Sequence, residues 1–302
     1  MSGFSRERRE AGLEPRALPR PAPAAAFFGP ISPMPGLINL HTHSNHSDGT
    51  LTPAGLAREA VRAGIKYFSL TDHDNVNGWA ELEPALKEAG ITYCYGVELT
   101  TNFHDNLHML GYGVNVRDAR FLSELTGYRA KRLERLKKIR ALLVAQGVDI
   151  KFEELPVDVR TLGRPHIADL LKEKGVVKTR KQGFQRYVAY GMPAYSPPCG
   201  PDVETAIRSI KNAGGLAVLA HPGVVKNVLD LPRWKEAGLD GIEAFYPAHS
   251  QALTREFIAL AARYDLFVTA GNDFHGPGSD RDKMYGFDYC EEHFAGIGRV
   301  FL

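Results

Sequence analysis

Histidines and carboxylates stand at or just after several short apolar runs of the sequence. The runs are residues 37–40, 67–70, 91–97, 216–220 and 266–270, and the polar residues that follow them are His41, His43, Asp48, His73, Glu98, His221, Asp273 and His275. A ninth residue, His108, precedes the run 109–114 instead of following one. In folds built on parallel strands, active sites are assembled at the carboxyl ends of the strands. The pattern therefore predicts one site formed by distant parts of the chain.

These residue types together indicate a metal site. A single pair such as His41 with His43, or Asp273 with His275, is usually incidental, although both of its side chains point to one face of a strand. Nine such residues in one place need another explanation, because an apolar core does not tolerate many unpaired polar groups. Imidazole and carboxylate ligands suit zinc, manganese or iron. The sequence thus predicts a cluster of divalent metal ions.

A cluster of divalent ions favours the hydrolysis of phosphate esters. That reaction needs a nucleophile at neutral pH and neutralisation of the charge on the phosphoryl oxygens. Closely spaced metal ions supply both, because they lower the pKa of a bridging water and hold the oxygens. No serine or cysteine nucleophile is required. We therefore take Asp273 as a candidate catalytic residue as well as a metal ligand.

The elements that would position these residues alternate between strand and helix. We expect strands at 37–40, 67–70, 91–97, 109–114, 216–220, 241–245 and 266–270, and helices at 52–63, 79–89, 206–213 and 253–262. Thr52 followed by Pro53 is typical of a helix start, and Gly90 of a helix end. Such alternation implies an α/β fold with a parallel sheet. Seven strands with helices between them favour a closed barrel over an open sheet.

Residues 117–200 interrupt the alternation between the fourth and fifth expected strands. Leu133, Leu136, Ile139 and Leu143 have helical spacing. The segment carries 18 Lys+Arg and 9 Asp+Glu, whereas residues 35–116 and 201–302 carry 14 and 23. We expect a basic helical insertion, 117–200, in a barrel formed by 35–116 and 201–302. Its charge is either that of a solvated helix face or that of a surface which attracts phosphates.

The remaining features of the sequence set its context. The formal net charge of +2 over 302 residues argues neither for nor against a nucleic-acid partner. No apolar run is long enough to cross a membrane. Cys94, Cys199 and Cys290 are scattered, which suits a reducing compartment, so we expect a cytoplasmic protein. Residues 1–34, rich in arginine, proline and alanine, predict a disordered extension or a start codon upstream of a true start at Met34.

The polar motifs resemble, in order, those of the PHP (polymerase and histidinol phosphatase) family. They are His41-Thr42-His43, Ser47-Asp48-Gly49, Thr71-Asp72-His73-Asp74, Gly96-Val97-Glu98, Leu107-His108, Ala220-His221-Pro222 and Asp273-Phe274-His275. The resemblance implies a distorted seven-stranded (β/α) barrel with a helical insertion between strands four and five, holding three divalent ions.

The same resemblance implies how the ligands are shared among the three ions. One ion would use His41, His43, Glu98 and Asp273, a second Glu98, His108 and His221, and the third Asp48, His73 and His275. Glu98 would then bridge two of the ions.

A narrower resemblance concerns the insertion. Gly163-Arg164-Pro165-His166-Ile167-Ala168, Pro193-Ala194-Tyr195 and Gly214-Gly215 are similar to the branch that contains bacterial nucleoside 3′,5′-bisphosphate phosphatases and 5′→3′ exoribonucleases. It implies that the substrate is a small phosphorylated nucleotide or a short RNA. Arg164 is then a candidate for bidentate phosphate binding. His166 is a candidate for binding the same group or protonating the leaving oxygen. The alternative is that Arg164 is an ordinary loop arginine and His166 an ordinary histidine at the start of a helix.

Three functions stay open on the sequence alone. The first is an enzyme that removes phosphate from nucleotides or cleaves nucleotides from the 5′ ends of RNA. The second is a phosphatase for another small metabolite such as histidinol phosphate. The third is a metal-binding module without turnover. The native metal and the oligomeric state are not indicated by any motif.

Residues 1–33 contain none of the expected ligands and few core residues. We predict that deleting them leaves phosphatase activity and thermal stability nearly unchanged. Activity assays and thermal melts of the truncated and full-length chains check this, and a large loss of either would show that the segment packs on the rest of the protein.

Overall fold

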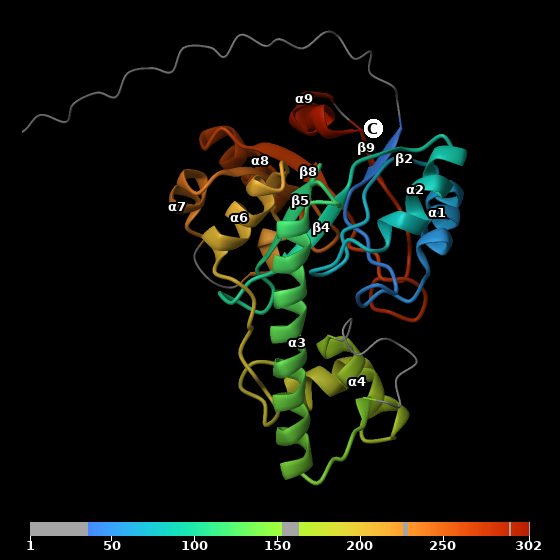
Figure 1. The fold of residues 1–302 in the computed structure, drawn as a ribbon, viewed down its shortest axis with the longest axis vertical. Coiled ribbons are helices and arrows are strands. Elements are labelled where there is room, and N and C mark those ends of the chain that lie inside the picture. The colour runs from blue at the N-terminus through green and yellow to red at the C-terminus, as the bar shows by residue number, and fades with distance from the viewer. Residues whose placement is uncertain (1–35, 153–162, 226–228, 290, 302) are drawn as a thin grey trace, which may run out of the picture. The chain divides into compact units, whose positions relative to one another are not determined.

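The strands form two sheets in the computed structural model, which describes residues 36–152, 163–225, 229–289 and 291–301. The first sheet has the order β3 (Thr92–Tyr93), β2 (Ile65–Phe68), β1 (Leu37–Asn39) and β9 (Phe287–Asp288). The second has the order β4 (Gly96–Thr100), β5 (His108–Tyr112), β6 (Leu216–Leu219), β7 (Leu239–Phe245) and β8 (Phe267–Ala270) (Figure 1). Isolated bridges join Thr42 to Phe274 and His73 to Glu98, so the sheets meet at two places.

Both sheets are mixed, which corrects the expectation of a parallel sheet. β5 is antiparallel to β4 and β6, and β9 is antiparallel to β1. The connection from β4 to β5 spans only residues 101–107. A parallel neighbour would need a crossover of a dozen or more residues, so this short loop permits only a hairpin.

The expectation of a single strand at 91–97 is also wrong. The chain forms two strands here, β3 and β4, which lie in different sheets. Cys94 N donates to Phe68 O of the first sheet, whereas Gly113 N donates to Tyr95 O beside the second. The chain therefore passes from one sheet to the other at this point. A continuous apolar run does not reveal such a change of partner.

Helices occur at all four expected places, and side-chain caps set their starts. The helices outside the insertion are α1 (Pro53–Arg62), α2 (Trp79–Glu88), α6 (Val203–Asn212), α7 (Leu231–Glu236), α8 (Gln251–Arg263) and α9 (Glu291–Phe294), followed by a 3₁₀ turn at Ala295–Val300. The Thr52 side chain accepts from Gly55 N as expected. α6 begins earlier than predicted because the Asp202 side chain accepts from Thr205 N.

The segment between β5 and β6 is helical and has a hydrophobic core of its own. It contains α3 (Ala119–Ala145), α4 (Arg164–Glu173), α5 (Arg180–Gly183) and a π-helical turn at Phe184–Val188. The first turns of α3 bury Phe121 and Leu125 in the main core, and its later turns bury Leu136, Ile139 and Leu143 in the second core. α3 runs from the strands toward α4 (Figure 1), so one helix connects the two cores.

Some expectations lie outside the described residues. They include the extension at 1–34 and part of the insertion, residues 153–162. Among the described helices, none is both long enough and apolar enough to cross a membrane.

The second core generates a stability prediction. Ile139 is fully buried there, so Ile139→Ala should lower the free energy of unfolding by about 2–5 kcal/mol. Leu142→Ala, on the exposed side of the same helix, is the control and should have a much smaller effect. Chemical denaturation of both variants checks this. Equal effects would contradict the assignment of the buried face.

Candidate metal centre and active site

All nine histidines and carboxylates singled out in the sequence come together at one edge of the strands. His41 and His43 follow β1, His73 follows β2, His221 follows β6, Asp273 and His275 follow β8, and Asp48 lies in the loop between β1 and α1. Glu98 lies within β4 rather than after it. His108 pairs with Thr100, at the end of β4. Because β5 is antiparallel, its first residue lies at the edge where the other strands end, which explains the exception in the sequence.

The Glu98 carboxylate stands at the centre of the group. Its Oε2 atom lies 3.2–3.3 Å from ring nitrogens of His41, His43 and His73. Its Oε1 atom lies 2.8 Å from His108 Nδ1 and 3.1 Å from His221 Nε2. The two oxygens of one carboxylate therefore face two separate sets of imidazoles.

Two further carboxylates complete the group. Asp273 Oδ1 lies 3.4 Å from His41 Nε2 and 3.1 Å from His43 Nε2. Asp48 Oδ1 lies 3.2 Å from His275 Nε2, and its Oδ2 lies 3.8 Å from His73 Nε2. Groups of donor atoms with the spacing of a metal site are His41, His43, Glu98 and Asp273; His43, Asp48, His73 and His275; and His73, Glu98 and His108.

The chemistry of these donors fits a metal ion. Among the described residues, seven buried side-chain nitrogen or oxygen atoms lack a hydrogen-bond partner, and six of them belong to this group. They are His41 Nε2, His43 Nε2, Asp48 Oδ1, His73 Nδ1, His221 Nδ1 and Asp273 Oδ1. Unpaired buried polar atoms destabilise a fold, and coordination to a cation satisfies them.

The pKa shifts within the group also favour the binding of cations. Burial raises the pKa of Glu98, but the neighbouring histidines outweigh it and hold that pKa well below its usual value. Burial likewise opposes ionisation of Asp273, and Arg281 and His41 keep its pKa well below normal. Burial lowers the pKa of His43, while Asp273 and Glu98 raise it to about 9. The carboxylates are thus anionic at neutral pH in a site that attracts cations.

A carboxylate outside the nine orients two of them. Glu243, on β7, is fully buried. His41 Nδ1 donates to Glu243 Oε1 at 3.0 Å, which leaves His41 Nε2 to face the other donors. Glu243 Oε2 accepts from the His221 backbone N at 2.8 Å. Carboxylates that fix the ring of a metal-binding histidine are common in metal sites.

The backbone around the site is strained. Four described residues other than glycine have a positive φ, and three of them are Asp74, His221 and Asp273. Such conformations cost free energy and persist where the surrounding structure imposes them. Asp72 helps to impose the loop after β1, because it accepts from Ser44 N and from the Ser47 hydroxyl. Gly49 packs so closely on the His43 carbonyl that a Cβ would lie 2.2 Å from the carbonyl oxygen.

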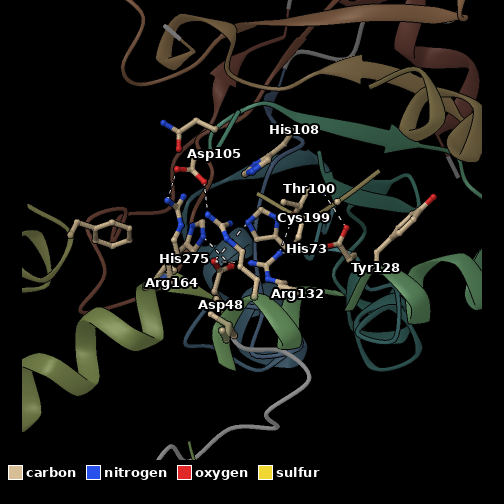
Figure 2. A pocket seen from close by; sticks show the side chains of 18 of the residues that line it. Asp48, His73, Thr100, Asp105, His108, Tyr128, Arg132, Arg164, Cys199 and His275 are labelled. Atoms are coloured by element: carbon tan, nitrogen blue, oxygen red, sulfur yellow. Dashed lines mark hydrogen bonds and ion pairs between the residues drawn. The ribbon is translucent and has the colours of Figure 1, made fainter. Parts of the chain in front are cut away.

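Arginines face the metal ligands across a cavity of about 270 Å³. Its lining includes Asp48, His73, His108 and His275, together with Arg132 and Arg135 of α3, Arg164 of α4 and Arg281. Figure 2 shows Arg132 and Arg164 beside Asp48, His73 and His275. Arg281 NH1 lies 2.5 Å from Asp273 Oδ2. The site thus presents both metal-type ligands and fixed cations to one space.

The structure gives Arg164 and His166 different surroundings. Arg164 NH1 contacts Asp105 Oδ2 at 2.9 Å, and Asp105 Oδ1 also contacts Arg135 NH2 at 2.6 Å. Burial lowers the pKa of Arg164 to about 10, so it stays charged at neutral pH. The ring of His166 caps α4, since its Nδ1 accepts from Gly163 N at 3.0 Å.

Sequence reasoning missed several residues of the site. Glu243 had a signal, because it is the charged residue inside the otherwise apolar strand 241–245. Arg132 and Arg135 also had one, since spacing of three places both on one helix face, but they were grouped with the other basic residues. Asp105 and Arg281 lie in loops, where no periodicity indicates which way a side chain points.

Comparison with known proteins identifies relatives over most of the chain. Residues 39–152 match the PHP domain. The chain is 33% identical over 253 residues to the 3′,5′-nucleoside bisphosphate phosphatase of Chromobacterium violaceum, covering 80% of this chain and 88% of that protein. It is 31% identical over 249 residues to a 5′-3′ exoribonuclease of Haemophilus influenzae, covering 79% of this chain and 90% of that protein. A Bifidobacterium adolescentis protein assigned as a metal-dependent phosphoesterase superposes with a TM-score of 0.76 at 30% identity, over 85% of this chain and 95% of that one.

An α/β scaffold with converging histidines, carboxylates and arginines defines this protein as a metal-dependent phosphoesterase. Sequence identity over most of the chain shows that it belongs to the PHP family. The protein is therefore a hydrolase acting on phosphoric ester bonds, as the first and second of the three hypotheses required.

Asp273→Asn tests the metal centre. The change keeps the shape of the side chain but removes a negative ligand, so metal content and hydrolytic rate should fall together. Elemental analysis of the purified protein and a phosphatase assay measure the two quantities. Asp265→Asn is a matched control, because Asp265 also has a positive φ and lies on the surface. Full activity with full metal content in Asp273→Asn would contradict a ligand role.

Glu243→Gln tests the buried carboxylate behind His41. The two donors, the His41 ring N–H and the His221 backbone N–H, contact different oxygens of the carboxylate. An amide has an oxygen at only one of these two positions, so it cannot accept both bonds as they stand. We expect the affinity for the divalent ion to fall about 10–100-fold, measured by competition with a chelator. An unchanged affinity would show that Glu243 does not position the ligands.

Proposed function

We propose that the enzyme hydrolyses the 3′ phosphate ester of nucleotides that also carry a 5′ phosphate. Its substrates would be nucleoside 3′,5′-bisphosphates or the 5′ ends of short RNA. The relatives named as a bisphosphate phosphatase and an exoribonuclease support this substrate class. Both substrates share one feature, a second anionic group at a fixed distance from the reacting ester.

One observation carries the proposal, namely the arginines that line the same cavity as the ligand cluster. Metal ions alone would address only the reacting phosphate, which all phosphomonoesters have. Arg132, Arg135 and Arg164 come from the insertion and have side chains only 8–14% exposed. Their guanidinium groups therefore face the cavity or buried partners rather than bulk water. Such a group of cations is suited to a second phosphate.

Metal ions would be held by the nine residues in the arrangement that the family resemblance implies, with Glu98 shared by two ions. We propose three divalent ions, manganese, zinc or iron. When bound, they would supply an activated water and neutralise charge on the reacting phosphate. The two faces of Glu98 support its sharing, and the donor group of His41, His43, Glu98 and Asp273 matches the first of these sites.

Among the chain's own groups, Arg164 would bind the remote phosphate. Asp105 holds the guanidinium in place through one nitrogen, NH1. A phosphate that enters the cavity gives the same guanidinium a second anionic partner. The basic residues that line the cavity would then bind the substrate. The alternative, a solvated helix face, applies to outlying residues such as Lys137, which pairs with Glu134 on the surface.

His166 does not line the cavity itself but follows Arg164 and Pro165, which do, and from there it would donate a hydrogen bond to the substrate. Burial lowers its pKa, and Arg132 lowers it further against the opposing effect of Asp48. The ring is therefore neutral at pH 7. Because Nδ1 accepts from Gly163 N, the proton of the neutral ring is on Nε2. A neutral ring is a poor proton donor to a leaving oxygen, so binding is the role that we favour over acid catalysis.

We also propose that the two sheets are arcs of one distorted seven-stranded barrel. Following the hydrogen-bonded neighbours and the two bridges gives the ring β1, β2, β4, β5, β6, β7, β8 and back to β1. A further hydrogen bond, from Leu40 N to Ala270 O at 2.9 Å, supports closure between β1 and β8. The barrel would consist of residues 35–116 and 201–302, with 117–200 as the insertion.

Arg164→Ala tests the substrate assignment. It should lower kcat/KM for a nucleoside 3′,5′-bisphosphate. The expected loss of transition-state stabilisation is about 2–5 kcal/mol, the usual cost of truncating one partner of a buried charge pair. The loss on a singly phosphorylated ester should be much smaller, and metal content should be unchanged. Steady-state kinetics on both esters provide the measurement.

Arg186→Ala is the control, since Arg186 is an exposed arginine of the insertion that stacks on Tyr187 outside the cavity. Equal losses on the two esters in Arg164→Ala would place Arg164 on the reacting phosphate. No loss on either ester would remove it from the site.

A further inference from the structure

A second hollow adjoins the arginine-lined cavity and has a different character. It measures about 700 Å³ and lies between the loop after β4 and residues 184–198 of the insertion. Its walls include the rings of Phe103, Phe184, Tyr190 and Tyr195. Tyr190 is 82% exposed and Phe103 is 45% exposed. Exposed aromatic rings gathered at one hollow indicate a binding surface rather than a core.

This aromatic groove is continuous with the metal centre. It shares Asp105, Asn106, Arg164 and Phe184 with the arginine-lined cavity. Asn106 also lines the small hollow formed by Glu98, His108, His221 and Asp273. A ligand can therefore extend from the reacting centre past Asn106 into the groove.

The groove is suited to a flat, uncharged group. Apart from His104, its ionisable lining residues other than the tyrosines are Asp105 and Arg164, and these two pair with each other at 2.9 Å. The remaining walls are mainly aromatic or apolar, and Tyr190 and Tyr195 meet edge to face with ring centroids 5.3 Å apart. Aromatic side chains bind unpaired nucleobases by stacking, with little dependence on which base is present.

The arginines beside the groove favour a nucleic acid strand as its occupant. The arginine-lined cavity suits phosphates, and the groove beside it suits bases. In a 3′,5′-bisphosphate the 3′ phosphate ends the molecule, whereas in a 5′-phosphorylated RNA the same phosphate carries the next nucleoside. That next nucleoside is joined to the same phosphorus through a different oxygen, so it extends from the reacting centre in a direction of its own. The groove, which meets the cavity at Asn106 and Arg164, provides a route.

We propose that the aromatic groove binds the base of the second nucleotide of a 5′-phosphorylated single-stranded RNA, with Tyr190 and Phe103 as stacking residues. The inference rests on the proposed function and adds to it, since it makes an oligonucleotide rather than a bisphosphate the substrate that uses the whole site. Binding there would contribute to catalysis only for substrates with a second base.

The test compares two substrates on the full-length, metal-loaded enzyme. One is a nucleoside 3′,5′-bisphosphate, and the other is a 5′-phosphorylated tetraribonucleotide. Tyr190→Ala should lower kcat/KM for the tetranucleotide about tenfold and leave that for the bisphosphate within about twofold. Phe103→Ala should act in the same direction, and Tyr190→Phe, which keeps the ring, should retain the wild-type value.

A modified substrate makes the test specific to the second base. A tetranucleotide with an abasic second residue should be cleaved by the wild-type enzyme at least as slowly as the normal one is cleaved by Tyr190→Ala, because it loses the contacts to both rings. Tyr190→Ala should cause no further loss on the abasic substrate. Tyr285→Ala removes another exposed tyrosine, outside the groove, and should affect neither substrate.

The outcomes separate this inference from the proposed function. If the wild-type enzyme cleaves both substrates but Tyr190→Ala loses nothing on the tetranucleotide, or loses equally on both, the groove does not bind the second base. Losses from the abasic residue and from Tyr190→Ala that multiply would also overturn the inference. If the wild-type enzyme cleaves neither substrate, the proposed function itself is wrong.

Discussion

The arrangement of the site depends on one buried carboxylate placed among five histidines from four different strand ends. Glu98 Oε2 faces His41, His43 and His73, while Oε1 faces His108 and His221. Packing so many polar rings around a buried anion has no structural benefit by itself, because several of their nitrogen atoms remain unpaired. Coordination to cations would satisfy these atoms. The fold therefore has a site suited to metal ions, as a metal-dependent phosphoesterase requires.

The topology serves this arrangement. Antiparallel β5 brings His108 to the edge where the parallel strands end, and the bridge between His73 and Glu98 brings the two sheets together at the centre of the site. The insertion then adds what the strands do not supply. α3 is anchored in the main core by Phe121 and in the second core by Ile139, so Arg132 and Arg135 between them are held on a rigid element facing the metal ligands. In the proposed function, reaction and recognition would thus come from different parts of the chain.

That the nine residues would come together in a candidate metal centre was predictable from the sequence, because a histidine or carboxylate directly after an apolar run has few structural roles. The pairing of the strands was not predictable from the sequence. β3 and β4 form one apolar run, and only the change of hydrogen-bond partner at Cys94 and Tyr95 separates them. The residues proposed to recognise the substrate were harder to predict than the candidate metal ligands. Arg164 was expected from a family motif, whereas Asp105 and Arg281 lie in loops whose conformation depends on contacts distant in sequence. Local patterns predict which strands carry ligands, and tertiary contacts decide what surrounds them.

The central proposal is that Glu98 would bridge two metal ions. Anomalous diffraction from crystals of the active, manganese-loaded protein tests it most directly, because it locates each ion independently of the protein atoms. The account predicts separate anomalous peaks within bonding distance of Glu98 Oε1 and of Glu98 Oε2, with His108 and His221 beside the first and His41 and His43 beside the second. A fully active crystal with no peak at Glu98, or with a peak at only one of its oxygens, would contradict it.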